Sequence, residues 1–197
     1  MNATKAETLD TAIAKLPRVQ LASVRPTPLE PMQRLTAHLK SPALHIKRDD
    51  LTGLAFGGNK TRMFEFSLAD ALAAGADTIV SGAAVQSNYC RQLAAACAKL
   101  GLELHLILRP VRDIDKTESQ GNNLLQHLLG AHITVIEEGK HIIQTGAIQA
   151  KVDELTAQGK KVYWPRREST IDLDVIAYVE VGVALGLAYL ESPIKVR

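Results

Sequence analysis

The chain has 197 residues, which is enough for one ordinary domain or for part of a larger two-domain protein. Hydrophobic residues make up 46% of it, and the formal net charge is +2 with acidic and basic residues interleaved. This charge pattern, together with an aromatic content of 4%, argues against a surface for nucleic acid or for a membrane. The composition therefore indicates a globular protein with a core.

The first residues, MNATKAETLDTAIAKLP, contain acids and lack the apolar stretch and cleavage site of a secretory signal, so we expect a cytoplasmic protein. Cys90 and Cys97 fall on one predicted helix, about 10 Å apart along its axis, which is too far for a disulfide. They share a face with Leu93 and Leu100, so we predict that both thiols are buried. The six histidines are scattered singly without a metal-binding spacing, and we predict no structural or catalytic metal.

From residue 43 onward, runs typical of β-strands alternate with helical patterns. Strands are predicted at 43–47, 77–81, 102–108, 132–136 and 161–164, and helices at 60–74, 86–100, 122–129 and 142–157. Glycines mark the predicted helix ends at Gly75, Gly101, Gly130 and Gly159. This alternation predicts right-handed crossovers and an α/β fold, in which helices cover both faces of a parallel sheet.

A last helix is predicted at 174–190, where only Glu180 interrupts an apolar sequence. A helix of this kind is expected to be buried on every side. It falls short of the roughly 20 apolar residues of a membrane span and lacks a basic flank at its start. We therefore favour a core helix of a second layer, most of which this chain does not contain.

Ligands of parallel sheets bind beyond the carboxyl ends of the strands, against helix N-termini, and two turns of this sequence occupy such positions. The first is GGNKTR, where Lys60 falls in the first turn of a predicted helix. The positive end of a helix dipole favours a bound anion or a neutral amine at that place. A solvated lysine beside a Gly-Gly-Asn cap explains the same pattern without chemistry.

The second turn is SGAAVQSNY, which runs from a predicted strand end into a helix start. Ser87 and Asn88 are good N-cap residues, and capping alone accounts for them. The alternative is an anion cradle, in which the helix amides and the side chains of Gln86, Ser87 and Asn88 hold a carboxylate. A dinucleotide or P-loop site is excluded, because the sequence has neither G-x-G-x-x-G nor GxxxxGK[ST].

Two long segments carry a resemblance to a known family: IKRDDLTGLAFGGNKTRMFEF at 46–66 and SGAAVQSNYCRQLAAACAKLGL at 81–102. They resemble the D-cysteine desulfhydrase and 1-aminocyclopropane-1-carboxylate deaminase family, in the tryptophan synthase β-like group of pyridoxal-phosphate enzymes. PTPLEPMQRL at 26–35 and GNNLLQHLLGA at 121–131 fit the same family, so the similarity runs over roughly residues 20–190. It implies the three-layer αβα architecture of fold type II.

The resemblance implies that Lys60 forms the internal Schiff base with pyridoxal 5′-phosphate and is a catalytic residue. Asn59 and Asn88 are then cofactor-binding residues, with Asn88 bonded to the 3′ oxygen of the cofactor. The cofactor then withdraws electrons from Cα of the substrate, and Lys60 either removes the α-proton as a base or returns a proton later. A lysine must lose its proton to form a Schiff base, and a helix N-terminus together with partial burial lowers the pKa of its amine.

The same resemblance implies that Gln86, Ser87 and Asn88 bind the substrate carboxylate, with Ser87 counted among the catalytic residues. Tyr89 is expected to contact substrate as well, and it stands where the family usually has histidine. PRRES at 165–169 replaces a Gly-Gly-Ser turn, and Arg62, Arg166 or Arg167 could offer charge to the cofactor phosphate. Members of the family continue past this chain with a glycine-rich phosphate loop, so we expect a C-terminally truncated member.

The implied activity is a pyridoxal-phosphate-dependent lyase or deaminase acting on a small amino acid, such as D-cysteine, which yields pyruvate, ammonia and hydrogen sulfide. The alternatives are a 1-aminocyclopropane-1-carboxylate deaminase, an inactive truncated member, or a subunit completed by a partner chain. We expect a homodimer or such a complementing chain, with no nucleic acid or membrane partner. The expected division is 1–49 for the N-terminal share of a large domain, 50–165 for a small α/β domain and 166–197 for the start of the large-domain remainder.

Overall fold

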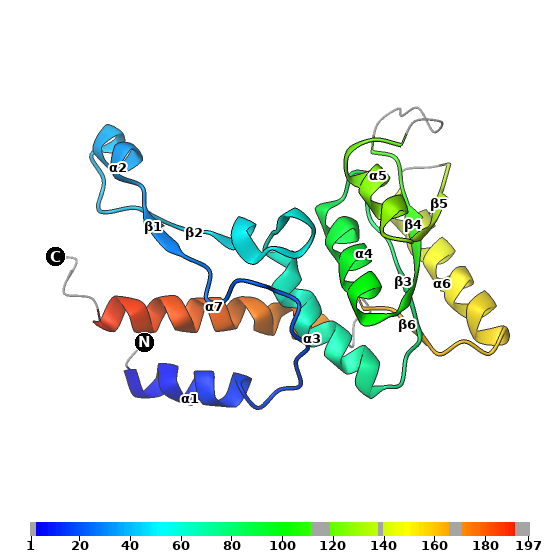
Figure 1. Cartoon of the computed structure of the whole chain (residues 1–197), viewed down its shortest axis with the longest axis horizontal. Helices are drawn as coiled ribbons and strands as arrows, with labels where there is room; N and C mark the ends of the chain where they lie inside the picture. The colour runs from blue at the N-terminus through cyan, green and yellow to red at the C-terminus, as the bar shows by residue number, and fades with distance from the viewer. Residues whose placement is uncertain (1–2, 112–118, 138–139, 166–170, 192–197) are drawn as a thin grey trace.

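The structure is a computed structural model that describes residues 3–111, 119–137, 140–165 and 171–191. Figure 1 shows a parallel sheet with helices α4, α5 and α6 at one end of the molecule, and α1, α7 and the β1–β2 pair at the other end. Helix α3 (Lys60–Ala73) lies between these two parts and contacts both α4 and α7.

The sheet has four parallel strands in the order β5-β4-β3-β6. They are β3 (Thr78–Ser81), β4 (Glu103–Leu108), β5 (His132–Val135) and β6 (Val162–Tyr163). The helices between them are α4 (Asn88–Leu100), α5 (Gly121–Leu128) and α6 (His141–Ala157). The α/β alternation predicted from residue 60 onward is therefore confirmed.

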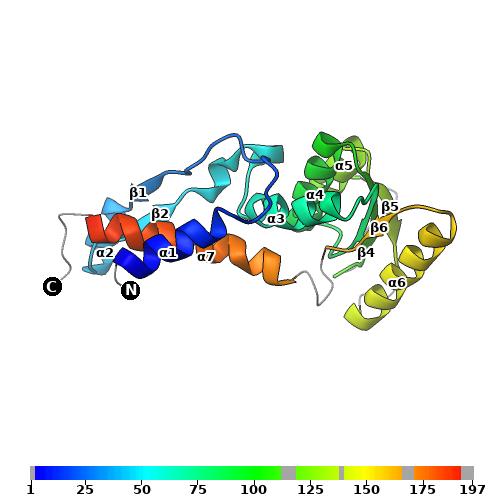
Figure 2. The same ribbon diagram turned by 90° about the horizontal axis from the view of Figure 1, so that it is seen from below.

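Alternating side chains of the sheet build two separate cores. Leu104 and Leu106 belong to the large core that also contains residues of α3 and α4. Ile107 and Val80 point to the opposite face, where they pack against Ile148 of α6. Figure 2 shows α4 and α5 on one side of the sheet and α6 on the other, so the predicted three-layer arrangement is confirmed.

The strand predicted at 43–47 does not join this sheet. It forms β2 (His45–Lys47), which pairs antiparallel with β1 (Leu29–Pro31). Two short 3-10 turns, Asp49–Thr52 and Leu54–Phe56, separate β2 from α3 and take the place of a tight strand-to-helix turn. A local β pattern does not specify its partner strand, and this is why the prediction was wrong about the sheet.

Helices α1 (Ala3–Ile13) and α2 (Gln33–Leu39) were not predicted, whereas α7 (Ile171–Glu191) was. Ala177 of α7 is fully buried, but Val175 is 53% exposed. Helix α7 packs on α1 and α3, and the described part of this chain leaves some of its apolar surface exposed. The role expected for it, as a core helix of a second layer, stays a prediction. None of the helices in that part is long and apolar enough to cross a membrane.

The two cysteines of α4 are buried and form no disulfide, as predicted. Cys97 is 1% exposed, and burial raises the pKa of its thiol to about 12. Both residues therefore act as small apolar groups that let α4 pack closely.

A buried carboxylate joins α3 to the N-terminal segment of the chain. Glu65 is 0% exposed, and its Oε1 accepts hydrogen bonds from the backbone N–H groups of Leu21 at 3.1 Å and Ala22 at 3.0 Å. Its Oε2 contacts the guanidinium of Arg25 and lies 3.5 Å from Nε of Arg18. Both carboxylate oxygens of Glu65 therefore have partners, which offset the cost of burying the charge.

The same two arginines extend this contact to α7. Arg25 donates to both carboxylate oxygens of Glu180, at 2.7 and 2.8 Å, and Arg18 lies 2.8 Å from Oε2 of Glu180. Glu180, the charge that interrupts the apolar α7 sequence, is therefore paired with both arginines. The ion cluster of Glu65, Glu180, Arg18 and Arg25 holds α3, α7 and the N-terminal segment together.

Substituting Glu65→Ala is expected to lower the free energy of unfolding by about 3–5 kcal/mol, because it leaves two backbone donors and the two arginines without their buried acceptor. Urea denaturation of the full chain measures this change. Glu7→Ala, at an exposed position of α1, is the control and should stay within about 0.5 kcal/mol of the unsubstituted chain. Equal effects of the two substitutions would contradict the structural role of Glu65.

Candidate active site

The two turns singled out in the sequence lie next to each other. Strand β3 ends at Ser81, and the following segment runs along the carboxyl edge of the sheet, where Ala84 bridges to Arg109 beyond the end of β4. Helix α4 then begins at Asn88, on the side where it contacts α3 and the turn that precedes α3. The structure thus places the N-termini of α3 and α4 at one end of the sheet.

The Gly-Gly pair before α3 is required by close contacts. Gly57 has φ 73°, and a Cβ at this position would lie 1.8 Å from the backbone oxygen of Asp50. Gly58 has φ 132°, and a Cβ there would lie 2.5 Å from Nε2 of Gln92. Only glycine combines this backbone conformation with so little space, and the pair sets the point where α3 begins at Lys60.

Lys60 is the first residue of α3, and its side chain is partly buried. Its Nζ lies 3.5 Å from Oδ1 of Asn59, which is a long hydrogen bond. Asn59 makes no side-chain cap to α3, and instead its Nδ2 donates to the hydroxyl of Tyr178 on α7 at 2.9 Å. The Asn59 amide is thereby held toward Lys60 rather than over the end of the helix.

Gln92 of α4 connects the two turns. Its side-chain oxygen accepts hydrogen bonds from both the backbone N–H and the hydroxyl of Thr61, each at 3.0 Å. Its Nε2 donates to the backbone oxygen of Asn88 at 3.1 Å. Gln92 is 1% exposed, so these bonds are made away from solvent.

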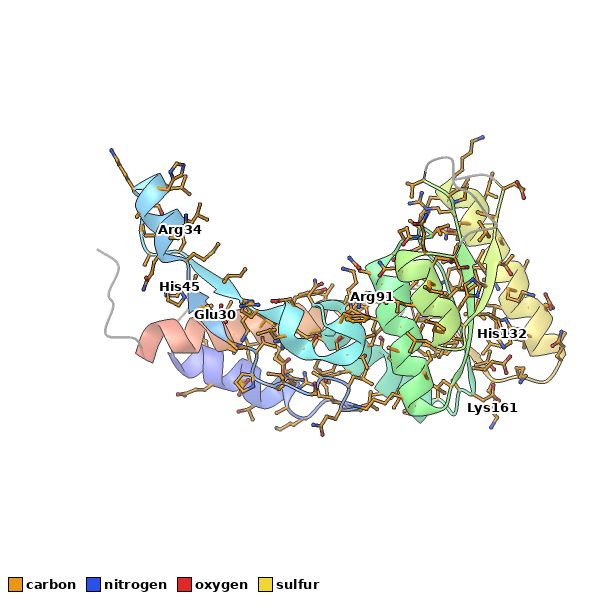
Figure 3. All side chains as sticks on the ribbon, turned by 45° about the horizontal axis from the view of Figure 1, so that its top comes forward. Glu30, Arg34, His45, Arg91, His132 and Lys161 are labelled. Atoms are coloured by element: carbon orange, nitrogen blue, oxygen red, sulfur yellow. The ribbon has the colours of Figure 1, made fainter. Side chains whose placement is uncertain are left out.

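Arg91, the neighbour of Gln92, makes a second connection. Its Nη2 donates to the backbone oxygen of Gly57 and to Oδ1 of Asn88, both at 3.3 Å. Burial lowers the pKa of Arg91. Figure 3 labels Arg91 between α4 and the turns that precede α3. Arg91 and Gln92 were not predicted as site residues, although two adjacent polar residues among the buried alanines of α4 were the available signal in the sequence.

Ser87 caps α4, as its position in the sequence predicted. Its Oγ accepts hydrogen bonds from the backbone N–H groups of Tyr89 at 3.1 Å and Cys90 at 3.3 Å. The hydroxyl still carries its own proton, which it can donate to an anion. Capping and binding are therefore compatible at this residue.

Asn88 has a defined amide orientation. Its Oδ1 accepts from Arg91 and from Nδ2 of Asn122 at 3.0 Å, which leaves the Asn88 Nδ2 group as the donor of the pair. Gln86 binds α5, because its Nε2 donates to the backbone oxygen of Gln120 at 3.0 Å and its Oε1 accepts from the Asn122 backbone at 2.9 Å. These bonds bring the start of α5 to the same edge of the sheet.

Tyr89 lies in the core, 2% exposed. Its ring packs on Phe64 with ring centroids 4.9 Å apart, and its hydroxyl lies 3.3 Å from Oγ of Ser81. The expected contact between Tyr89 and a substrate would require the ring to leave this packing. In this structure the ring of Tyr89 anchors the first turn of α4 to Phe64 in the core.

Arg62 is 4% exposed and pairs with Asp49 through two hydrogen bonds of 2.8 Å. Burial raises the pKa of Asp49, but hydrogen bonds from Arg62 and Thr27 outweigh it, and the pKa lies below its ordinary value. The expectation that Arg62 offers its charge to a phosphate is corrected, because the guanidinium is committed to Asp49. Arg166 and Arg167 lie outside the described residues.

The family described as pyridoxal-phosphate dependent enzymes matches this chain over residues 21–187. The chain belongs to this family, and the family expected from the 46–66 and 81–102 segments is confirmed. The roles expected for Lys60 and for the residues of the second turn stay predictions.

Two curated relatives show the extent of the similarity. The 1-aminocyclopropane-1-carboxylate deaminase of Methylobacterium nodulans is 41% identical over 143 residues, which are 70% of this chain and 42% of the relative. The D-cysteine desulfhydrase of Klebsiella pneumoniae subsp. pneumoniae is 40% identical over 179 residues, which are 88% of this chain and 52% of the relative. The chain thus spans about half the length of the curated relatives it matches.

Solved structures agree with the fold. The crystal structure of an ACC deaminase homologue superimposes with a TM-score of 0.80 at 32% identity, over 98% of this chain and 55% of that chain. Diaminopropionate ammonia lyase from Escherichia coli, in complex with an aminoacrylate-PLP azomethine intermediate, superimposes with a TM-score of 0.68 at 15% identity, over 98% of this chain and 50% of that chain. The latter likeness concerns the fold alone.

Gln92→Ala is expected to lower the free energy of unfolding by about 1–3 kcal/mol, because the buried donors of Thr61 lose their shared acceptor. Amide hydrogen exchange at Thr61 should accelerate in the same variant. Gln149→Ala, which removes an exposed amide of α6, is the matched control and should leave both quantities unchanged. Unchanged exchange at Thr61 in Gln92→Ala would contradict the connection between the two turns.

Asp49→Asn is expected to cost about 2–3 kcal/mol at neutral pH, because Arg62 loses its charged partner. The lowered pKa of Asp49 means that its contribution is present above its ordinary pKa of 3.8 and is lost as the pH falls through the folded-state value. As the pH falls below about 4, the free energy of unfolding should therefore decrease less in the variant than in the unsubstituted chain. Thermal unfolding measured across this range checks the slope, with the exposed Asp10→Asn as control.

Proposed function

We propose that this chain carries the cofactor lysine and the substrate-carboxylate site of a pyridoxal-phosphate-dependent lyase that acts on a small amino acid. The reaction that we favour converts D-cysteine and water to pyruvate, ammonia and hydrogen sulfide. The observation that carries the proposal is the joining of two helix N-termini. Gln92 and Arg91 hold the turn of Lys60 against the turn of Asn88.

The residues at this edge of the sheet fit pyridoxal phosphate. Within the described ranges no carboxylate pairs with Lys60, whose amine has only a 3.5 Å contact to Asn59 and remains available to an aldehyde. The Asn88 amide has its oxygen engaged and its nitrogen left as a donor, which suits an oxygen on the cofactor ring. Lys60, Asn59 and Asn88 would therefore hold the cofactor.

Pyridoxal phosphate, when bound, supplies the electron sink for negative charge at Cα of an amino acid. Lys60 then moves the proton at Cα, because an amine that reaches the cofactor aldehyde also reaches the adjacent carbon. The Ser87 hydroxyl and the first amides of α4 bind the substrate carboxylate at the positive end of the helix. Gln86 positions this turn through its bonds to Gln120 and Asn122.

Two observations bear on the substrate. The similarity to D-cysteine desulfhydrase extends over 88% of this chain, whereas that to the Methylobacterium deaminase extends over 70%, which supports the desulfhydrase reaction. The TM-score of 0.80 with an ACC deaminase homologue supports 1-aminocyclopropane-1-carboxylate deamination as the second candidate. Both substrates are small amino acids whose carboxylate the α4 turn would bind.

We further propose that the protein works in the cytoplasm as a homodimer or with a complementing second chain. The exposed apolar side chains of Val175, Tyr178 and Val179 on α7 support an assembly that covers them.

Incubation with pyridoxal phosphate, followed by borohydride reduction and peptide mass spectrometry, should find a pyridoxyl group on Lys60. Lys60→Arg keeps the charge but should abolish the label. Lys15→Arg, at an exposed position on the segment after α1, should leave the label in place. A chain without any label on Lys60 would contradict the cofactor role.

The substrate is tested separately. Protein that has been incubated with pyridoxal phosphate, without borohydride reduction, is given D-cysteine, and the release of sulfide and ammonia is measured. Release of both, lost in Lys60→Arg, supports the desulfhydrase. Ammonia from 1-aminocyclopropane-1-carboxylate without sulfide from D-cysteine favours the second candidate. A label on Lys60 with neither product contradicts the lyase activity of this chain alone and favours an inactive member or one that a partner chain completes.

A further inference from the structure

A second group of chemically capable side chains lies at the opposite end of the sheet from the candidate active site. Glu103 is the first residue of β4, His105 follows it by two positions, and His132 is the first residue of β5. The proposed lyase reaction uses none of these residues. Each carries a side chain that can ligate a metal ion.

The sheet itself places these three side chains on one face. Residues two apart in a strand point the same way, so Glu103 and His105 share the face of Ile107, which packs against α6. The parallel pairing of β4 with β5 sets His105 opposite His132. The two imidazole rings stack with their centroids 4.6 Å apart. Figure 3 labels His132 on the α6 side of the sheet, away from Arg91.

The ligand atoms are close together. Nε2 of His105 lies 2.8 Å from Oε1 of Glu103, and Nε2 of His132 lies 4.0 Å from the same oxygen. One ligand atom from each of the three residues falls within 4.8 Å of the others. A tetrahedral ion with ligand bonds of about 2.1 Å needs its ligands about 3.4 Å apart. Small side-chain rotations would bring the present spacing to that value.

The cluster is open to solvent on one side. The side chain of His132 is 63% exposed, whereas that of His105 is 15% exposed. An ion can therefore enter past the exposed ring of His132 and meet Oε1 of Glu103, which lies close to both histidine rings. Lys160 lies 2.6 Å from the other oxygen, Oε2 of Glu103, and its positive charge opposes a second cation nearby.

We propose that Glu103, His105 and His132 form a binding site for one divalent transition-metal ion, with solvent completing the coordination. Two imidazoles and one carboxylate favour Zn²⁺, Cu²⁺ or Ni²⁺ over Mg²⁺ or Ca²⁺, which prefer ligand sets made of oxygen alone. The ion links the edge strand β5 to the more central strand β4 at the start of both strands. Its effect is therefore on the stability of the sheet edge, remote from Lys60.

The prediction of no metal rested on the absence of ligands at short spacings along the sequence. This site depends instead on the pairing of two strands. His105 and His132 are separated by all of α5 and come together only because β4 and β5 pair in this register.

Isothermal titration calorimetry of the tag-free full chain with Zn²⁺ alone tests the proposal. We expect one bound ion per chain and a rise in the thermal unfolding temperature with added Zn²⁺. His132→Gln should weaken binding by tenfold or more and abolish that rise. Because the side chain of His132 is exposed, the variant is expected to stay folded. Removal of the exposed His127 of α5, as His127→Gln, is the matched control and should change neither quantity.

Lys160→Met distinguishes a metal site from a cluster that only stabilises the fold. It removes the opposing charge and frees Oε2 of Glu103, so the affinity for Zn²⁺ should rise several-fold. A hydrogen-bonded cluster without metal predicts only a loss of stability in this variant. Absence of Zn²⁺ binding, or binding that His132→Gln leaves unchanged, would overturn the proposal.

Discussion

The side-chain amide of Gln92 joins two helix N-termini, and the candidate active site depends on this contact. Its oxygen receives both donors of Thr61 at the start of α3, and its nitrogen reaches the backbone of Asn88 at the start of α4. A buried amide with both ends bonded permits little movement. Since Lys60 precedes Thr61 directly, the same bonds hold the first residue of α3 near the start of α4, in the turn that we propose for substrate binding.

The ion cluster around Glu65 and Glu180 supports this arrangement from the other side. It holds α7 against α3, and α7 supplies the Tyr178 hydroxyl that orients the amide of Asn59. The charges of the cluster are paired across three segments that are distant in sequence. Helix α7 therefore contacts both the N-terminal segment and one proposed cofactor residue.

The two ends of the parallel sheet have different chemistry for a simple geometric reason. All strands run in the same direction, so helix N-termini with their free amides gather at the carboxyl ends. Lys60 and Ser87 lie there. The amino ends instead bring side chains of neighbouring strands together, because the pairing sets His105 of β4 opposite His132, the first residue of β5. The proposed lyase site and the proposed metal site are separated by the length of the sheet.

Hydrophobic periodicity and glycine positions in the sequence were sufficient to predict the strands and helices from residue 60 onward. The motifs around Lys60 and Asn88 were sufficient to predict the family. These signals are local, because a strand or helix is recognised by the spacing of its own residues. Tertiary structure alone decided that β2 pairs with β1, that Tyr89 and Arg62 are buried, and that Arg91 and Gln92 join the two turns. It also brought His105 to His132. Such contacts form between residues far apart in the chain, and no local pattern records which distant partner a side chain will meet.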